Sequence, residues 1–576
     1  MNERVQVSLS PLAAVARSYA ALREYDDPAL FISLKPEAQL LKDAADLEAA
    51  GPAGKPLYGL VFAVKDNIDA AGLPTTAACP AFSYQPECSA FVVARLEAAG
   101  ALVLGKTNLD QFATGLVGVR SPYGVPRNAQ RADLIPGGSS SGSAVAVAAG
   151  IVDFSLGTDT AGSGRIPAGM NGIVGLKPTL GLLSATGMVP ACRTLDTISV
   201  FARSVELARL VTETAAAYDP ADAYSRRLPL PLASGVPPRL RVGVPKTGQR
   251  KFFGDAATEA AYSADLASFA ALGAEVIEIN FEPLHAVARL LYEGPWLAER
   301  YAATKPLIES QPEALHPVTR AIIGGAKHLT AVAAFEATYR LMDLKRQTAP
   351  ILAAFDCLAV PTVPRAYTVA EVEAEPMTLN SNLGSYTNFV NLLDLAAIAV
   401  PTGIRPDGLR SSLTLIGGAG SDGHLAGIAA ALEGGVRPPA PLRATGDRIE
   451  IAVVGAHLSG LPLNAELLAL GAGFLRAVET TRDYRLFALP GTTPAKPGLL
   501  RVAAGTGAAI ATEVWALEPA AFGSFVARIP APLGIGTLSF SDGTAAKGFL
   551  VEAEAARAAR DISEFGGWRA FLAAGA

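Results

Sequence analysis

Apolar residues recur at helical spacing near the start of the chain and then shorten into strand-like runs. Residues 10–27 and 36–50 place apolar side chains every three or four positions, which predicts two helices. From about residue 58 onward, short apolar runs alternate with helical patterns, which predicts a mixed α/β core with helices covering a β-sheet. The clearest of these strand-like runs lie at 57–64, 101–105, 240–245, 274–280 and 357–361.

The pattern changes near residue 434. Residues 434–448 are rich in Pro, Gly and Arg and have no apolar period, so we expect a linker. Beyond it, short strand-like runs with turn residues between them predict a smaller, mainly β domain over 449–576, with a closing helix near 553–573. These runs lie at 449–457, 484–490, 500–505, 511–518, 525–530 and 536–543. We therefore expect one α/β domain at 1–433 and a second domain of a different kind.

Composition narrows the class of protein. With 576 residues, 50% of them hydrophobic and 18% charged, the chain is expected to be a globular enzyme with at least two domains. A net charge of −5 offers no basic surface for nucleic acid. No run of about twenty apolar residues indicates a membrane span, and the start MNERVQVSLS lacks the features of a secretory signal. Four cysteines without a CxxC pair indicate reduced thiols and no metal site, so we expect a cytoplasmic protein.

Two serines in the segment 137–178 are candidates for chemistry. Ser139 and Ser163 each follow a glycine, and Lys65 ends a strand-like run upstream. A serine hydroxyl becomes a nucleophile when a base takes its proton, and a buried lysine with a lowered pKa can be that base. A second hydroxyl can relay the proton. A flexible linker is the alternative for GSSSGS, but the apolar pattern at 144–157 predicts a buried helix followed by a strand.

These motifs resemble the amidase signature family, whose members cleave C–N amide bonds with a Lys–Ser–Ser triad. The resemblance covers most of residues 55–405 and implies an amidase signature fold, a mixed β-sheet core covered by helices. It also implies that Ser163 is the nucleophile, Ser139 the bridging serine and Lys65 the base. In the family the bond into the bridging serine is cis, which here is Gly138–Ser139.

The resemblance extends to the loop around the nucleophile. It implies that the backbone amides of Thr160, Ala161, Gly162 and Ser163 form an oxyanion hole, since such donors stabilise the charge of a tetrahedral intermediate. Asp159 and Arg165 flank this loop, and we expect them to hold it in place rather than to react.

Details of the sequence resemble the allophanate hydrolases within this family. The nucleophile loop reads TDTAGSGR, and LYEGPWLAERYA places Tyr292 and Arg300 eight positions apart, about two turns on one face of a predicted helix. An arginine fork suits a carboxylate. The resemblance implies that Tyr292 and Arg300 recognise a small anionic substrate and that Gly115 makes a backbone contact with it.

Residues 449–576 resemble the C-terminal domain of allophanate hydrolases, which has a γ-glutamylcyclotransferase-like fold. No acidic residue stands where a cyclotransferase keeps its catalytic glutamate, so we do not expect that activity. We expect His457, in VVGAHLSGLPLN, to have a structural role. The alternative is that it transfers a proton to a carbamate intermediate.

The resemblance implies hydrolysis of allophanate to ammonia and carbon dioxide without a cofactor or metal. It places the reaction in urea degradation beside a biotin-dependent urea carboxylase, or in a cyanuric acid route, and it implies a homodimer. Two alternatives stay open: a general amidase with an apolar acyl pocket, and a glutaminase-type subunit of an aminoacyl-tRNA amidotransferase.

Overall fold

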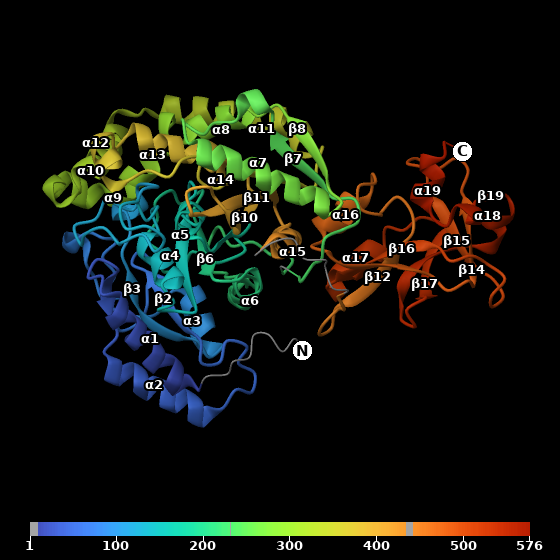
Figure 1. Ribbon diagram of the computed structural model, residues 1–576, viewed down its shortest axis with the longest axis horizontal. Coiled ribbons are helices and arrows are strands. Elements are labelled where there is room, and N and C mark those ends of the chain that lie inside the picture. Colours follow the sequence, from blue (N-terminus) through green and yellow to red (C-terminus); the bar gives the residue numbers. More distant parts are fainter. Residues whose placement is uncertain (1–9, 231, 434–441, 576) are drawn as a thin grey trace.

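The computed structural model describes residues 10–230, 232–433 and 442–575 of the chain. A large part with helices on both faces of a β-sheet is followed by a smaller, mainly β part (Figure 1). This arrangement confirms the predicted fold class.

The large part is built on an eleven-stranded mixed sheet. In the order in which they lie side by side, its strands are β1 (Phe31–Leu34), β3 (Leu102–Thr107), β2 (Val61–Lys65), β4 (Phe154–Asp159), β6 (Thr197–Ala202), β5 (Val174–Lys177), β10 (Leu395–Ile404), β11 (Arg410–Gly418), β9 (Cys357–Pro361), β7 (Arg241–Pro245) and β8 (Glu275–Ile279). Strand β2 is parallel to both of its neighbours, whereas β5, β6, β10 and β11 pair with antiparallel ones. All five strands predicted in this part are present.

Helices cover both faces of the sheet. In chain order they are α1 (Pro11–Tyr25), α2 (Glu37–Ala50), α3 (Phe91–Ala98), α4 (Ser141–Ala148), α5 (Ile166–Asn171), α6 (Val205–Ala215), α7 (Ala256–Ala271), α8 (Glu282–Glu293), α9 (Leu297–Ser310), α10 (Pro317–Gly325), α11 (Ala331–Leu352), α12 (Val369–Ala374), α13 (Thr378–Leu383), α14 (Asn388–Leu392) and α15 (Asp422–Leu432). The first two confirm the helices predicted near the start, and the short strand β1 between them was not predicted.

The alternation of side chains along β2 explains the two layers. Phe62 and Val64 belong to an apolar cluster with residues of α3, α6 and α15, whereas Val61 and Ala63 belong to another cluster with residues of α4. Side chains two positions apart on a strand point to the same face. Lys65 therefore shares the face that α4 covers.

The C-terminal part has a five-stranded and a three-stranded sheet. Its elements are β12 (Ile449–Val453), α16 (Asn464–Ala469), β13 (Gly473–Glu479), β14 (Tyr484–Ala488), β15 (Pro497–Arg501), β16 (Ala511–Leu517), α17 (Pro519–Val526), β17 (Leu533–Ser539), β18 (Ala545–Val551), α18 (Ala553–Arg557), β19 (Arg560–Asp561) and α19 (Trp568–Ala573). Four of the predicted strand-like runs coincide with β12, β14, β16 and β17.

Three predictions for this part are wrong. The strand expected at 500–505 lies earlier, because β15 pairs with β14 over 497–501. Residues 525–526 end helix α17 instead of beginning a strand, and Pro519 opens that helix. The closing helix at 553–573 is divided, because β19 pairs with β14 and Gly566 follows with a left-handed φ of 66°.

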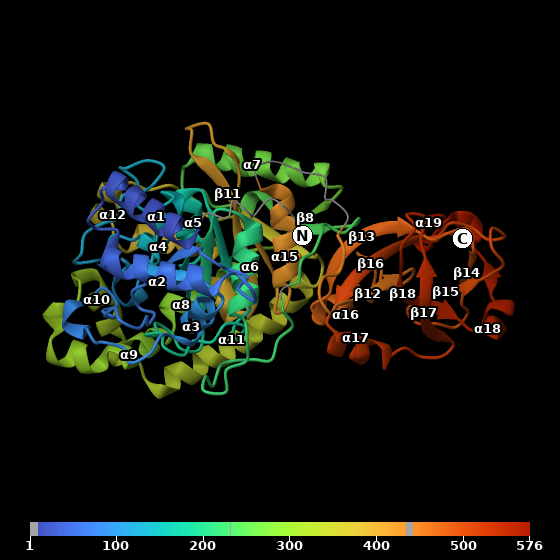
Figure 2. The same ribbon diagram turned by 90° about the horizontal axis from the view of Figure 1, so that it is seen from below.

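The C-terminal part lies beside α15 in both views (Figures 1 and 2). The Phe474 amide in β13 donates to Ser234 Oγ at 3.0 Å, and Arg448 forms an ion pair with Glu213 of α6. Of the predicted linker, residues 434–441 lie outside the described residues, and residues 442–448 run to β12 without a helix or strand. Among the residues described, no helix combines the length and apolar character needed to cross a bilayer.

Candidate active site

Lys65 ends β2 and is fully buried. Its side-chain nitrogen donates to Ser139 Oγ and to Thr158 Oγ1, each at 2.7 Å. Strand β2 thus brings the lysine to the loop that precedes α4. This placement confirms that Lys65 ends a strand and excludes a position on the surface.

The surroundings of Lys65 favour its neutral form. Burial lowers the pKa of Lys65 to about 7, and the nearby Arg300 guanidinium contributes to the lowering. The carboxylates of Asp110, Asp196 and Asp159 act in the opposite direction. Because a lysine in water remains protonated up to about pH 10, this shift makes a proton-accepting amine available near neutral pH.

Ser139 lies in the tight loop before α4. The Gly138–Ser139 peptide bond is cis, as predicted. A β-carbon on Gly138 would lie 2.0 Å from Asp110 Oδ2, so only glycine fits this close approach. The Asp110 amide donates to the Ser139 carbonyl at 3.0 Å, and the Asp110 carboxylate accepts from the Gly118 amide at 2.9 Å. These contacts hold the Ser139 hydroxyl against the buried amine.

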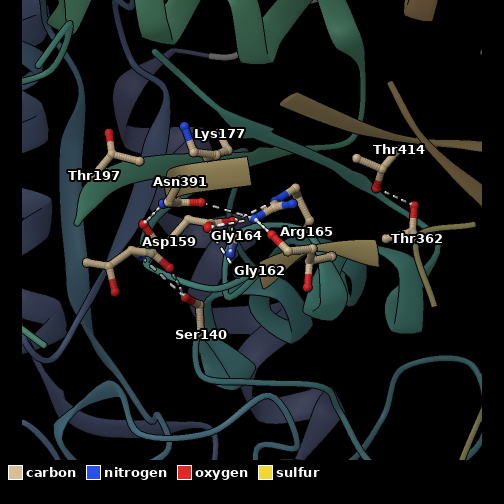
Figure 3. Close-up of polar contacts among 12 residues, drawn as sticks. Ser140, Asp159, Gly162, Gly164, Arg165, Lys177, Thr197, Thr362, Asn391 and Thr414 are labelled. Atoms are coloured by element: carbon tan, nitrogen blue, oxygen red, sulfur yellow. Dashed lines mark hydrogen bonds and ion pairs between the residues drawn. The ribbon is translucent and has the colours of Figure 1, made fainter. Parts of the chain in front are cut away.

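Ser163 lies in the loop between β4 and α5, and a buried ion pair holds this loop (Figure 3). Both Asp159 oxygens accept from the Arg165 guanidinium at 2.9 Å, and they also accept from the amides of Gly162 and Gly164 at 3.0 Å. Burial disfavours the charged form of Asp159, but Arg165 keeps its pKa below the ordinary value. The prediction that this pair fixes the loop is confirmed.

Gly162 shapes the backbone just before the nucleophile candidate. Its φ of 132° is unfavourable for other residues, and a β-carbon there would lie 2.5 Å from Thr387 Oγ1. Its amide donates to Asp159, so in this geometry it is not directed at a substrate carbonyl. The predicted oxyanion hole at residues 160–163 therefore depends on the other three amides.

The two serine loops contact each other. Ser140, next to Ser139, donates from Oγ to the Thr158 carbonyl at 3.2 Å, and Thr158 is five positions before Ser163. The Ser163 side chain is buried at 2% exposure, and within the described chain its hydroxyl has no hydrogen-bond partner. The structure thus joins Lys65 directly to Ser139, while Ser163 lies on the adjoining loop.

Tyr292 and Arg300 come together across a break that the sequence analysis did not predict. Tyr292 lies in α8 and Arg300 in α9, because Gly294 and the following proline interrupt the expected single helix. The Arg300 guanidinium carbon nevertheless lies 5.8 Å from the centre of the Tyr292 ring. The Tyr292 hydroxyl is buried and has no hydrogen-bond partner in the described structure.

Gly115 lies beside this pair. Arg300 donates to the Ala113 carbonyl and to Thr114 Oγ1, both at 3.1 Å, so the guanidinium borders the segment that ends at Gly115. A β-carbon on Gly115 would lie 2.5 Å from Asp110 Oδ2. The three predicted substrate-binding residues therefore cluster, and the charge of Arg300 acts on Lys65.

Three polar residues near Lys65 were missed by sequence reasoning. Thr158 accepts a hydrogen bond from the lysine, Asp110 holds the Ser139 loop, and Asp196 accepts from the Thr160 hydroxyl. The TDT run at the end of β4 was a signal for Thr158, since polar residues rarely end a buried strand without a partner. For Asp110 and Asp196 the sequence carries no comparable signal.

His457 lies in the C-terminal part, between β12 and α16. It borders a cavity of about 310 Å³ that Lys496 and Arg528 also line. The imidazole stacks on Phe549 with ring centres 5.5 Å apart, and its Nε2 lies 3.1 Å from Glu466 Oε2. Burial lowers the pKa of His457. This histidine both packs and faces a cavity, so the geometry is compatible with either predicted role.

Family profiles match both parts of the chain. The amidase profile matches residues 13–426, and the profile of the allophanate hydrolase C-terminal domain matches residues 449–573. The chain therefore belongs to the amidase family of amidohydrolases, and it carries an allophanate hydrolase C-terminal domain.

Individual relatives narrow the comparison. The solved structure of Kluyveromyces lactis allophanate hydrolase is similar with a TM-score of 0.76 and 40% identity, over 99% of this chain and 98% of that chain. Urea amidolyase from Lachancea kluyveri is 43% identical over 575 residues, which is 95% of this chain but 31% of that protein. A glutamyl-tRNA(Gln) amidotransferase subunit from Geobacillus kaustophilus is 34% identical over 452 residues, 72% of this chain and 91% of that protein. The chain thus spans under a third of the urea amidolyase that it matches.

Proposed function

We propose that this chain hydrolyses allophanate, with Ser163 as nucleophile and with Lys65 and Ser139 as the proton-transfer pair. The observation that carries the proposal is the 2.7 Å contact between the buried Lys65 amine and the Ser139 hydroxyl, beside the loop of Ser163. Similarity to the K. lactis allophanate hydrolase along 99% of the chain supports the choice of substrate.

The reaction proceeds through an acyl-enzyme. Lys65 accepts the Ser139 proton while Ser139 takes the proton of Ser163, and Ser163 Oγ attacks the amide carbonyl of allophanate. The free amides of residues 160–163 stabilise the oxyanion. The proton then passes back through Ser139 to the leaving nitrogen, the C–N bond breaks, and ammonia departs. The acyl group remains on Ser163 as an ester.

Water completes the turnover. The same lysine and serine take a proton from water, which attacks the ester and releases a nitrogen that carries two carboxylates. Loss of carbon dioxide from this species gives carbamate, which yields ammonia and a second carbon dioxide. The sum is two ammonia and two carbon dioxide per allophanate. The base and the oxyanion donors are protein groups, so these steps use no cofactor.

Arg300 and Tyr292 supply the preference for an anionic acyl group. The Arg300 Nη1 is committed to Ala113 and Thr114, and the rest of its guanidinium fork supplies charge-assisted donors for a carboxylate. The unpartnered Tyr292 hydroxyl is a further donor for the same ligand. Gly115 offers its backbone, where a larger residue would clash with Asp110.

Ammonia release from allophanate, compared with malonamide and a simple aryl amide, tests this function. Wild type should prefer allophanate, Ser163→Ala should be inactive on all three, and Arg300→Ala should lose the preference. A preference for simple amides that is unchanged in Arg300→Ala would favour the general amidase. Activity that requires partner subunits would favour the glutaminase-type alternative.

The cavity beside His457 supports a second, subordinate proposal for the C-terminal domain. The cations of Lys496 and Arg528 line it, which suits an anion, and His457 stands at its wall. We infer that the domain takes up the dicarboxylated nitrogen and that His457 delivers a proton as carbon dioxide leaves. In His457→Gln the second ammonia should appear later than the first. Simultaneous release of both would leave His457 with its packing role alone.

An exposed face of α11 supports the predicted homodimer. Val332, Phe335, Tyr339 and Met342 lie along one side of this helix and are 66%, 62%, 64% and 59% exposed. Apolar stripes of this kind are typical of interfaces. Two copies of α11 packed antiparallel across a two-fold axis would bury the stripe on both sides.

Charges beside the stripe favour a second copy as the occupant. Glu336 and Arg340 are exposed one turn apart on the same helix. An antiparallel pair centred between them sets Glu336 of each copy opposite Arg340 of the other. Light scattering should give a dimer for wild type and a monomer for Phe335→Glu, whereas Ile404→Glu, at an equally exposed site on β10, should remain dimeric. A wild-type monomer would contradict the proposal.

The remaining proposals follow from the family resemblance. We propose a cytoplasmic protein divided into 1–433, a linker at 434–448 and 449–576, linked in function to a biotin-dependent urea carboxylase. Similarity to urea amidolyase supports urea degradation over the cyanuric acid route.

A further inference from the structure

Asp196 joins two loops at the active site. It lies one residue before β6 and accepts a hydrogen bond from the Thr160 hydroxyl, at the start of the nucleophile loop. It also accepts from the Ala191 amide at 2.7 Å and from the Cys192 amide at 3.0 Å. The first of the predicted oxyanion-hole residues is therefore tied through one carboxylate to the turn at 191–192.

The charge of Asp196 is held by neutral donors. Asp159 is neutralised by its ion pair with Arg165, whereas no cation lies within ion-pair distance of Asp196 in the described structure. Burial raises the pKa of Asp196 to about 6, and the nearby Arg300 guanidinium opposes the rise. The carboxylate also borders a cavity of about 360 Å³. It therefore remains a net negative charge beside the site at neutral pH.

Lys65 lies within the field of this charge. The charged groups that face Lys65 are Asp110 from the loop after β3, Asp159 at the end of β4, Asp196 before β6 and Arg300 from α9. The three carboxylates favour the protonated lysine and Arg300 disfavours it. Asp196 is the one of these carboxylates that also contacts the predicted oxyanion loop through a side chain.

We propose that Asp196 is a positioning residue for amide hydrolysis: through Thr160 it orients the loop that carries Ser163, and through its charge it acts on the Lys65 amine. This inference rests on the proposed function. It assigns one carboxylate two separable effects, the geometry of the oxyanion donors and the proton-binding strength of the base. A merely structural residue would have only the first.

Two variants separate these effects. Asp196→Asn keeps the shape and removes the charge, whereas Thr160→Val removes the hydrogen bond and keeps the charge. Both should lower kcat for allophanate, by roughly 100-fold, because displaced catalytic groups cost about that much. Only Asp196→Asn should also move the acid limb of the kcat/KM profile, by about one pH unit to lower pH, because a neighbouring negative charge no longer favours protonated Lys65.

Asp196→Glu keeps the charge and serves if Asp196→Asn fails to fold; its acid limb should lie within a few tenths of a pH unit of that of wild type. An unmoved limb in folded Asp196→Asn, or an equal movement in Thr160→Val, would overturn the role of the charge. The proposed function fails separately, if wild type releases no ammonia from allophanate. An acid limb in wild type that persists in Lys65→Arg would also count against that function and not against Asp196.

Discussion

The side-chain nitrogen of Lys65 lies 2.7 Å from the hydroxyl oxygen of Ser139, although the residues are 74 positions apart in the chain. Both are fully buried, and the second hydrogen bond of Lys65 goes to the Thr158 hydroxyl. The hydrogen-bond partners of this lysine are therefore hydroxyls and not carboxylates. A charged ammonium gains little there to offset its lost hydration, so the neutral amine is favoured.

Replacing Lys65 should abolish the chemistry without abolishing the fold. Lys65→Arg retains a long cationic side chain that stays protonated at any accessible pH, so it cannot act as a base. We expect ammonia release from allophanate to fall by roughly 10²–10⁴-fold, the contribution typical of general base catalysis. Thermal unfolding reports whether the variant is folded. Near-normal activity in a folded Lys65→Arg would rule out Lys65 as the base.

The activity should decline in acid with an apparent pKa of about 7, the value to which burial lowers Lys65. Above this pH the amine is neutral and accepts the Ser139 proton. Below it the amine is protonated, and kcat/KM should fall tenfold for each pH unit. The profile of kcat/KM between pH 5 and 9 measures this limb. A rate that is flat down to pH 5 would contradict a catalytic lysine.

Tyr292→Phe should weaken substrate binding without loss of stability. The Tyr292 hydroxyl is buried and without a protein partner in the described structure, so its removal breaks no native hydrogen bond. We expect KM for allophanate to rise roughly tenfold, with an unchanged melting temperature and unchanged kinetics on an aryl amide. A lower melting temperature with unaltered KM would show instead that the hydroxyl serves the fold.

The Asp159–Arg165 ion pair should be necessary for stability. Arg165→Met leaves a buried carboxylate without its cation, which costs about 3–5 kcal/mol in the free energy of unfolding. Chemical denaturation measures this cost. The matched control is Arg131→Met, which removes one partner of the exposed Arg131–Asp133 pair and should change stability little. Equal losses in the two variants would argue against a special role of the buried pair.

Local patterns in the sequence predicted the elements that carry the site. The apolar run before Lys65 is strand β2, and the small apolar residues after Ser139 are helix α4 followed by β4. These segments have unambiguous periods because they are buried, so nearly every position reports the element. The motif around Ser163 likewise predicted the role of Asp159 and Arg165 as the support of the loop.

Long-range pairing could not be predicted in the same way. The break between Tyr292 and Arg300 preserves their proximity, which helical spacing alone does not explain. Strand β19 divides the last predicted helix because it pairs with β14, more than seventy positions away. Asp196 shows the same limit for the site: its importance arises from a contact with Thr160 that only the folded chain creates.

Mass spectrometry of the protein, quenched with acid during turnover of allophanate, tests the nucleophile most directly. The acyl group, or the carbamoyl group left after loss of carbon dioxide, should be found on the peptide that contains Ser163 and should be absent from Ser163→Ala. An adduct on Ser139 or elsewhere, or steady ammonia release by Ser163→Ala, would contradict the assignment of Ser163.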